Sequence, residues 1–313
     1  MKKWTLFLGL YFCLCLLLGG CGAVSGSASG TMPEKSAATE IDLDQDETPV
    51  YLTCRIVDGA ADGNLLLAEL ADGLYGGHDG LHDGRSVYRL AVTKDMAVTL
   101  DGKAVTAADL KDGMPVEIAF AGAVEDSFPA GLGEVYSIAA YSIGTQQSPG
   151  GSYDDLCGLY LQVLEDLWDT DSGLNGGVKV IGLDLSQAPG NLTDSEKSAI
   201  AWRFGELHGG SVVTGTFDEL LEQGYITATP ISTPAPEEGQ DFRNLWYEWE
   251  DGMFFSITPN EGHEGETYSL PVLFFDAEKW RTSLGAYWFC DCSCVWPEGG
   301  TWSGYSIGSE MIS

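Results

Sequence analysis

Two histidines and two aspartates lie close together in a glycine-rich stretch, residues 78–84. His78, Asp79, His82 and Asp83 are candidate metal ligands, because imidazole groups suit zinc, copper or nickel. Their spacing matches no closed structural metal site. Aspartate and glycine also favour turns. We therefore predict an exposed hairpin loop for this stretch, with a metal site as the alternative.

A second acidic cluster lies where a predicted helix ends. Asp169 and Asp171 occupy the first and third positions of a stretch that begins like a calcium-binding loop. The pattern then fails, because positions five, six and twelve hold Gly173, Leu174 and Val180. Acidic groups are unfavourable at the carboxyl end of a helix dipole. This leaves some reason to expect a nearby cation, but we predict a solvated helix end rather than a calcium site.

Three cysteines alternate near the carboxyl terminus, at Cys290, Cys292 and Cys294. A regular strand would place all three sulfur atoms on one face. With Cys54 and Cys157 they make five cysteines after Cys21, an odd number that allows at most two disulfides among them and leaves a free thiol. Three interpretations stay open: buried free thiols, a disulfide, or zinc held by the three alternating cysteines and a histidine.

Aromatic side chains are concentrated in the C-terminal third of the chain, and two basic residues flank one of them. If some of these side chains point outward from a sheet, they form a surface for a protein, peptide or glycan partner. The alternative is that most of them pack in the core. The predicted contact residues are Trp246, Trp249, Lys279, Trp280 and Arg281.

The sequence contains no nucleophile elbow, zinc-protease helix, phosphate loop or dinucleotide fingerprint. We therefore predict no catalytic residue and no cofactor, and favour binding over catalysis. The alternative is a cell-envelope hydrolase with a cleft around His208 or His263. Either histidine is also the candidate fourth ligand of the zinc site.

Residues 50–145 alternate between apolar and polar in a way typical of short strands. Val50, Leu52, Cys54 and Ile56 share one face of the first strand, and Asp-Gly pairs separate the later ones. Asp101-Gly102 is the strongest hairpin signal. We predict a small antiparallel β barrel or sandwich.

Residues 146–152 have the composition of a linker, and residues 153–313 begin with helical periodicity. Capping boxes at Thr193–Glu196 and Thr216–Glu219 predict two helices, the first ending at Gly209. Strands follow, and Glu250-Asp251-Gly252 is predicted to join two of them as a hairpin. Helices followed by strands, without strict alternation, indicate an α+β domain. The fold class is therefore multi-domain.

The amino terminus has the features of a secretory signal. Lys2 and Lys3 precede an apolar run over residues 4–18 that is short for a membrane-spanning helix. The sequence Leu-Gly-Gly-Cys then ends at Cys21, and it resembles the lipobox of bacterial lipoprotein precursors. This resemblance implies that residues 1–20 are removed and that Cys21 carries the lipid. It places the chain on the extracytoplasmic face of the cell membrane, anchored by lipid.

Residues 21–49 are small and then acidic, which indicates a disordered tether. Removing residues 1–20, with two lysines and no acid, takes the net charge from −32 to −34. Such a charge excludes nucleic acid as a partner and leaves the lipid as the membrane attachment.

Segments of the mature sequence resemble further bacterial proteins. Residues 98–129 are similar to the small OB-like domains of uncharacterised extracytoplasmic lipoproteins of Gram-positive bacteria. Residues 275–287 and 308–313 are similar to segments of uncharacterised secreted proteins of the same bacteria. These resemblances imply a fold and a location, and no activity. We therefore expect an anchored extracytoplasmic binding module, with a metal-binding lipoprotein or an envelope hydrolase as alternatives.

Overall fold

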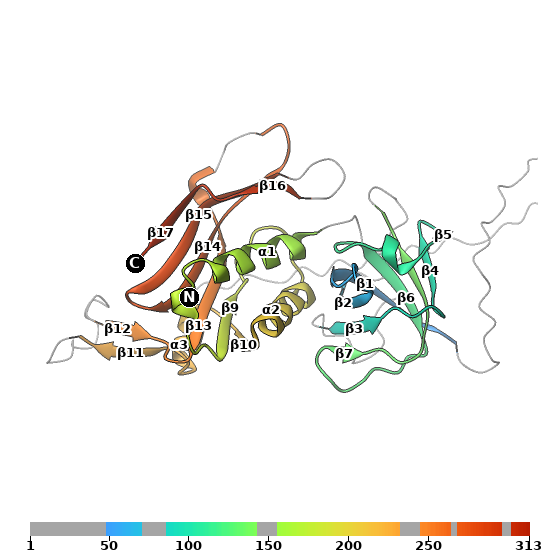
Figure 1. The fold of residues 1–313 in the computed structure, drawn as a ribbon, viewed down its shortest axis with the longest axis horizontal. Helices are drawn as coiled ribbons and strands as arrows, with labels where there is room; N and C mark the ends of the chain where they lie inside the picture. The colour runs from blue at the N-terminus through green and yellow to red at the C-terminus, as the bar shows by residue number, and fades with distance from the viewer. Residues whose placement is uncertain (1–47, 71–85, 143–154, 232–244, 264–267, 296–301) are drawn as a thin grey trace, which may run out of the picture. The chain divides into compact units, whose positions relative to one another are not determined.

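A computed structural model describes residues 48–70, 86–142, 155–231, 245–263, 268–295 and 302–313 (Figure 1). These residues are mostly β and form two curled sheets that belong to one compact unit. The His78–Asp83 loop, Cys21, residues 22–47 of the predicted tether and the 146–152 linker lie outside the described residues. None of the described helices has the length and apolar character needed to cross a membrane.

The first sheet has eight strands in the order β5-β4-β8-β6-β1-β2-β3-β7. Most neighbours are antiparallel, as predicted, but β4 with β8 and β3 with β7 are parallel pairs. The sheet is therefore mixed rather than purely antiparallel. Its strands are β1 (Val50–Asp58), β2 (Asn64–Glu69), β3 (Val87–Ala91), β4 (Ala97–Leu100), β5 (Lys103–Ala104), β6 (Pro115–Phe120), β7 (Ala130–Gly131) and β8 (Val135–Ala140), with a 3₁₀ turn η1 (Ala107–Asp109) after β5.

The predicted hairpin at Asp101-Gly102 is confirmed. It joins β4 to β5, and its two residues have φ of 50° and 76°. Positive φ at both central residues is the backbone that a tight two-residue hairpin requires, and Gly adopts it without steric strain. The side chain of Asp101 also fastens the turn, because its Oδ1 accepts a hydrogen bond from the Ser142 amide at 2.9 Å.

The second sheet has nine strands, six of them in the order β10-β9-β13-β14-β12-β11, with β15 beside β14 and with β16 and β17 beside β15. Its strands are β9 (Val180–Asp184), β10 (Ser211–Thr214), β11 (Thr227–Pro230), β12 (Leu245–Glu248), β13 (Gly252–Pro259), β14 (Val272–Thr282), β15 (Gly285–Val295), β16 (Ser303–Ser306) and β17 (Ser309–Ile312). The helices are α1 (Leu156–Asp169), α2 (Asp194–His208) and α3 (Phe217–Glu222), with 3₁₀ turns η2 (Ser172–Asn175) and η4 (Glu261–His263).

Both capping boxes form as the sequence predicts. At the start of α2 the Glu196 amide donates to Thr193 Oγ1 at 3.2 Å, and the Thr193 amide donates to Glu196 Oε2 at 2.8 Å. Thr216 and Glu219 repeat both bonds at the start of α3. Gly209 ends α2 in the left-handed conformation with φ of 63°.

The predicted hairpin at Glu250-Asp251-Gly252 is wrong. Strand β12 pairs with β11 and β14, whereas β13 pairs with β9 and β14, so the two strands on either side of the turn are not partners. The buried ring of Trp249 explains the geometry of the turn. A Cβ at Gly252 would lie 1.9 Å from Trp249 Cε2, so only glycine allows the chain to pass this ring.

The largest core joins the first sheet to the helices of the second half. Val57, Leu66, Ala68 and Val87 belong to the same buried cluster as apolar side chains of α1 and α2. Most of strand β1 is therefore buried on both sides: Leu52, Cys54 and Ile56 pack within the first sheet, Val57 packs in the core shared with the helices, and Arg55 pairs with Glu196 of α2.

Candidate functional site

The predicted aromatic contact surface is largely buried. Trp249 is 2% exposed and packs with Leu220 and Ile226 under α3. Trp280 is 8% exposed, and its ring meets that of Phe217 edge to face, with centroids 4.9 Å apart. These tryptophans are core residues because α3 covers this face of the sheet, so neither forms an exposed contact surface in this structure.

Lys279 was predicted to contact a partner, but it is fully buried. Its ammonium group donates hydrogen bonds to the carbonyl oxygens of Trp168, Thr170 and Asp171 and to the side-chain oxygen of Asn175. This is the cation expected beside the acidic end of α1, and it comes from strand β14 of the same chain. Burial lowers the pKa of Lys279 to about 8, against the opposing attraction of Asp171 and Asp169.

The other two predicted contact residues are held by internal hydrogen bonds. Arg281 donates to the carbonyl oxygens of Leu174, Gly176 and Glu250, the last two at 2.7 Å and 2.6 Å. The half-buried Trp246 donates its indole N–H to Glu248 Oε2 at 2.8 Å. Arg281 thus fastens the loop before β9 and the turn before β13.

The alternating cysteines do not share one face. The pairing of β14 with β15 shifts register between Phe275 and Ala277, and Asp291 has φ of 55°. This bulge leaves Cys290 partly exposed while Cys292 and Cys294 are buried. All five cysteines among the described residues are free thiols. Burial, the largest cause, raises the pKa of Cys292 to about 12 and that of Cys294 to about 11.

The two candidate histidines of the hydrolase alternative each pair with an acid. His208 Nε2 lies 2.8 Å from Glu165 Oε1, and its ring stacks on Trp168 with centroids 3.9 Å apart. His263 Nε2 lies 2.6 Å from Asp291 Oδ1. Neither histidine lines the cavity between α2 and β10.

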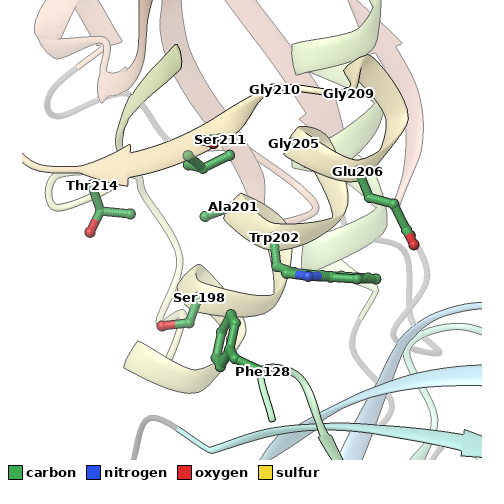
Figure 2. Close-up of a pocket in the computed structure, with 11 residues that line it drawn as sticks. Phe128, Ser198, Ala201, Trp202, Gly205, Glu206, Gly209, Gly210, Ser211 and Thr214 are labelled. Atoms are coloured by element: carbon green, nitrogen blue, oxygen red, sulfur yellow. The ribbon is translucent and has the colours of Figure 1, made fainter. Parts of the chain in front are cut away.

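A cavity of about 570 Å³ lies between α2 and the edge strand β10, and Figure 2 shows the side chains around it. This volume is in the range of small-molecule and peptide side-chain pockets. Aromatic rings contribute from two sides, with Trp202 on α2 and Phe128 from the loop between β6 and β7. Phe128 is 61% exposed. The remaining lining residues are Ser198, Ala201, Gly205, Glu206, Gly209, Gly210, Ser211, Val212 and Thr214.

Small side chains on one flank of α2 create this space. Ser198, Ala201 and Gly205 recur at helical spacing and all line the cavity. Gly205 also sets the approach of the helix to β10, because a Cβ there would lie 2.4 Å from Val212 Cγ2. The helix therefore lies close to β10 at Gly205 and leaves the cavity beside it.

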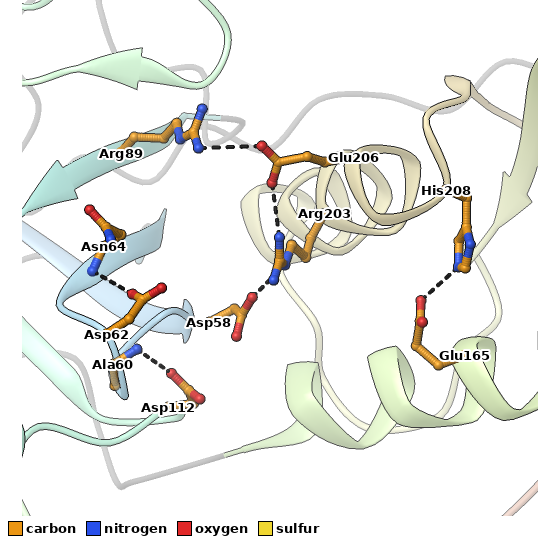
Figure 3. Close-up of polar contacts among 10 residues, drawn as sticks. All are labelled: Asp58, Ala60, Asp62, Asn64, Arg89, Asp112, Glu165, Arg203, Glu206 and His208. Atoms are coloured by element: carbon orange, nitrogen blue, oxygen red, sulfur yellow. Dashed lines mark hydrogen bonds and ion pairs between the residues drawn. The ribbon is translucent and has the colours of Figure 1, made fainter.

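Ion pairs hold Glu206, which lines the cavity, to Arg203 and Arg89, as Figure 3 shows. Glu206 accepts hydrogen bonds from Arg203 at 2.9 Å and from Arg89 at 3.3 Å, and Arg203 also pairs with Asp58. The guanidinium carbon of Arg89 lies 4.8 Å from the centroid of the Trp202 ring. Residues of β1 and β3 thus hold Trp202 and Glu206 in place at the rim.

The cavity was missed at the level of sequence. Its signal was the run of small residues at Ser198, Ala201 and Gly205, followed by Gly209-Gly210. Gly209 and Gly210 predicted only where the helix ends. Whether a small-residue flank packs against a neighbour or borders open space depends on the position of β10 and of Phe128, which local sequence does not determine.

Comparison with known proteins gives no relative for this chain. No family model, curated protein or solved structure matches it. In the described residues, no group of three or more His, Cys, Asp or Glu side chains is arranged to hold a metal ion.

Proposed function

We propose that this chain is a lipid-anchored extracytoplasmic binding module whose ligand site is the cavity between α2 and β10. Cys21 would carry the lipid, residues 21–49 would be the tether, and the body would bind a protein, peptide or glycan partner. The first sheet would be an OB-like barrel and residues 153–313 an α+β domain. The observation that carries the binding proposal is the α2–β10 cavity, with aromatic walls and small-residue flank.

The anchor is tested by expressing the full chain in a Gram-positive host fed an alkyne-labelled fatty acid. The wild-type chain should take up the label and sediment with membranes, because acyl chains at Cys21 give stable anchoring. Cys21→Ser should lose the label. Cys290→Ser removes a partly exposed thiol elsewhere and should keep it. Equal labelling of the wild type and Cys21→Ser would refute the anchor.

The ligand site is tested with N-acetylphenylalanine methylamide, a capped aromatic residue, added to the purified full chain in detergent. Hydrogen exchange followed by mass spectrometry should show slower exchange in peptides covering residues 198–214. Ser198→Trp should abolish the effect by filling the cavity, whereas Ser198→Thr should retain it. Protection elsewhere, or unchanged protection in Ser198→Trp, would contradict this site.

A further inference from the structure

Strand β10 is an edge strand with a row of main-chain groups directed away from the sheet. In the described part of the chain it pairs only with β9, in parallel. The Ser211 amide donates to Lys179 O at 2.9 Å, and the Gly215 amide donates to Leu183 O at 3.2 Å. Alternate residues of a parallel strand bond to the same neighbour. The N–H and C=O groups of Val212 and Thr214 therefore face the opposite edge.

The same two residues line the cavity, so the outward edge of β10 borders it. Val212 packs on the core that contains α2 residues, whereas Val213 packs on the cluster under α3. The cavity beside Val212 therefore lies on the α2 side of the sheet. A strand added beside β10 would lie about 4.8 Å from it. Its alternate side chains would face Ser198, Ala201 and Gly205.

We infer that β10 receives an extended peptide of a partner protein as an added strand, with a large apolar side chain of that peptide between Trp202 and Phe128. This inference rests on the proposed function and specifies its ligand. Main-chain hydrogen bonds to Val212 and Thr214 supply the affinity, and the small-residue flank of α2 supplies the pocket for alternate side chains. The net charge of −32 favours a basic peptide, since a strongly acidic protein attracts cationic segments.

The probe is the hexapeptide acetyl-Thr-Lys-Phe-Lys-Thr-Lys-amide with a fluorophore, whose phenylalanine and lysines lie on opposite faces when it is extended. Fluorescence anisotropy measures its binding to the full chain in detergent. Two analogues of equal composition carry N-methyl groups, one at residues 2 and 4 and the other at residues 3 and 5. Because successive amides of a strand point to opposite edges, one analogue should bind at least about tenfold more weakly and the other within about twofold of the parent.

A protein variant gives the reciprocal test. Thr214→Pro removes the outward N–H at an edge position where proline is tolerated. It should lower the affinity for the hexapeptide at least about tenfold. Thr214→Val keeps the N–H and should bind within about twofold of the wild type. An analogue with glutamates in place of the lysines should bind more weakly than the parent.

Each contrary outcome identifies what has failed. Equal binding of both methylated analogues, with loss of binding in Ser198→Trp, would overturn strand addition and leave the cavity as a ligand site. No binding of the hexapeptide, with protection by the capped phenylalanine, would also overturn strand addition alone. Slow hydrogen exchange at β10 in the absence of peptide, together with a doubled molecular mass in solution, would show that a second copy of the chain occupies this edge. That result would overturn the inference. Failure of both probes would remove the proposed ligand site itself.

Discussion

Lys279 of β14 donates a hydrogen bond to the carbonyl oxygen of Trp168 at 3.2 Å, and so supplies a positive charge to the carboxyl end of α1. The last carbonyl groups of a helix have no partner within the helix and carry partial negative charge. Thr170, Asp171 and Asn175 contribute further oxygens to the same ammonium group. A side chain of the same chain thus supplies the positive charge at this end of α1.

Replacing Lys279 by methionine should destabilise the protein by about 1–3 kcal/mol, because the part-buried oxygens of Trp168, Thr170, Asp171 and Asn175 would lose its ammonium donor. Urea unfolding followed by circular dichroism measures the change. Lys94 is exposed, so Lys94→Met is the matched control and should change stability by less than about 0.5 kcal/mol. If both variants unfold at the same urea concentration, the oxygens around Lys279 do not depend on its ammonium group.

The stability contributed at Lys279 should vary with pH in a defined direction. Its pKa is about 8 in the folded protein, below the usual value of 10.5. Between these pH values the unfolded chain holds a proton that the folded chain has released, so this group makes the free energy of unfolding rise with pH. Below about pH 8 both states are protonated and the effect is constant. The stability of the wild type relative to Lys279→Met should therefore rise from about pH 7 to about pH 10; a constant or falling difference would contradict the lowered pKa.

The buried ion pair between β1 and α2 should matter far more than a helix cap alone. Arg55 Nε lies 2.6 Å from Glu196 Oε1, and both side chains are buried. Glu196→Gln keeps an oxygen for the Thr193 amide but removes the negative charge that lies 2.6 Å from Arg55 Nε, and should cost about 3–5 kcal/mol.

Helix α3 provides the matched control for this pair. Glu219 makes the same capping bonds with Thr216 at an exposed site. Glu219→Gln should change the free energy of unfolding by less than about 1 kcal/mol. Similar losses in Glu196→Gln and Glu219→Gln would assign the effect to the cap and not to the ion pair.

Thiol alkylation should distinguish Cys290 from its neighbours. Cys292 and Cys294 are at most 1% exposed and have raised pKa values, so they offer little reactive thiolate. Iodoacetamide should label Cys290 at least about tenfold faster than either neighbour in the native protein, as measured by mass spectrometry of peptides. In concentrated urea the three rates should converge. Equal native rates would show that the bulge at Asp291 does not protect the inner thiols.

Local signals predicted the elements well where neighbours along the chain determine the structure. The cap at Thr193 and Glu196 depends only on residues three apart, and the turn at Asp101-Gly102 depends on two backbone conformations. Both formed as expected. The period-two pattern of β1 likewise identified the face that packs within the first sheet.

Predictions that depended on distant pairing were less successful. The turn at Glu250-Asp251-Gly252 looks like a hairpin, but β14 pairs with both β12 and β13 and keeps them from pairing with each other. Lys279 and Trp280 look like a surface patch because basic residues are usually exposed. Their burial follows from contacts with the end of α1 and with α3, more than 60 residues away in sequence. The α2–β10 cavity was missed for the same reason.

The largest core has a consequence for how the chain is divided. Val57, Leu66, Ala68 and Val87 of the first sheet complete a core that α1 and α2 begin. Cut at the linker, the first half would expose these side chains to water and the second half would expose the side chains of α1 and α2 that pack on them. Expressed alone, each half should therefore be less stable and less soluble than the two halves together. A transplanted first sheet would also need the arginine and the apolar side chains that α2 requires.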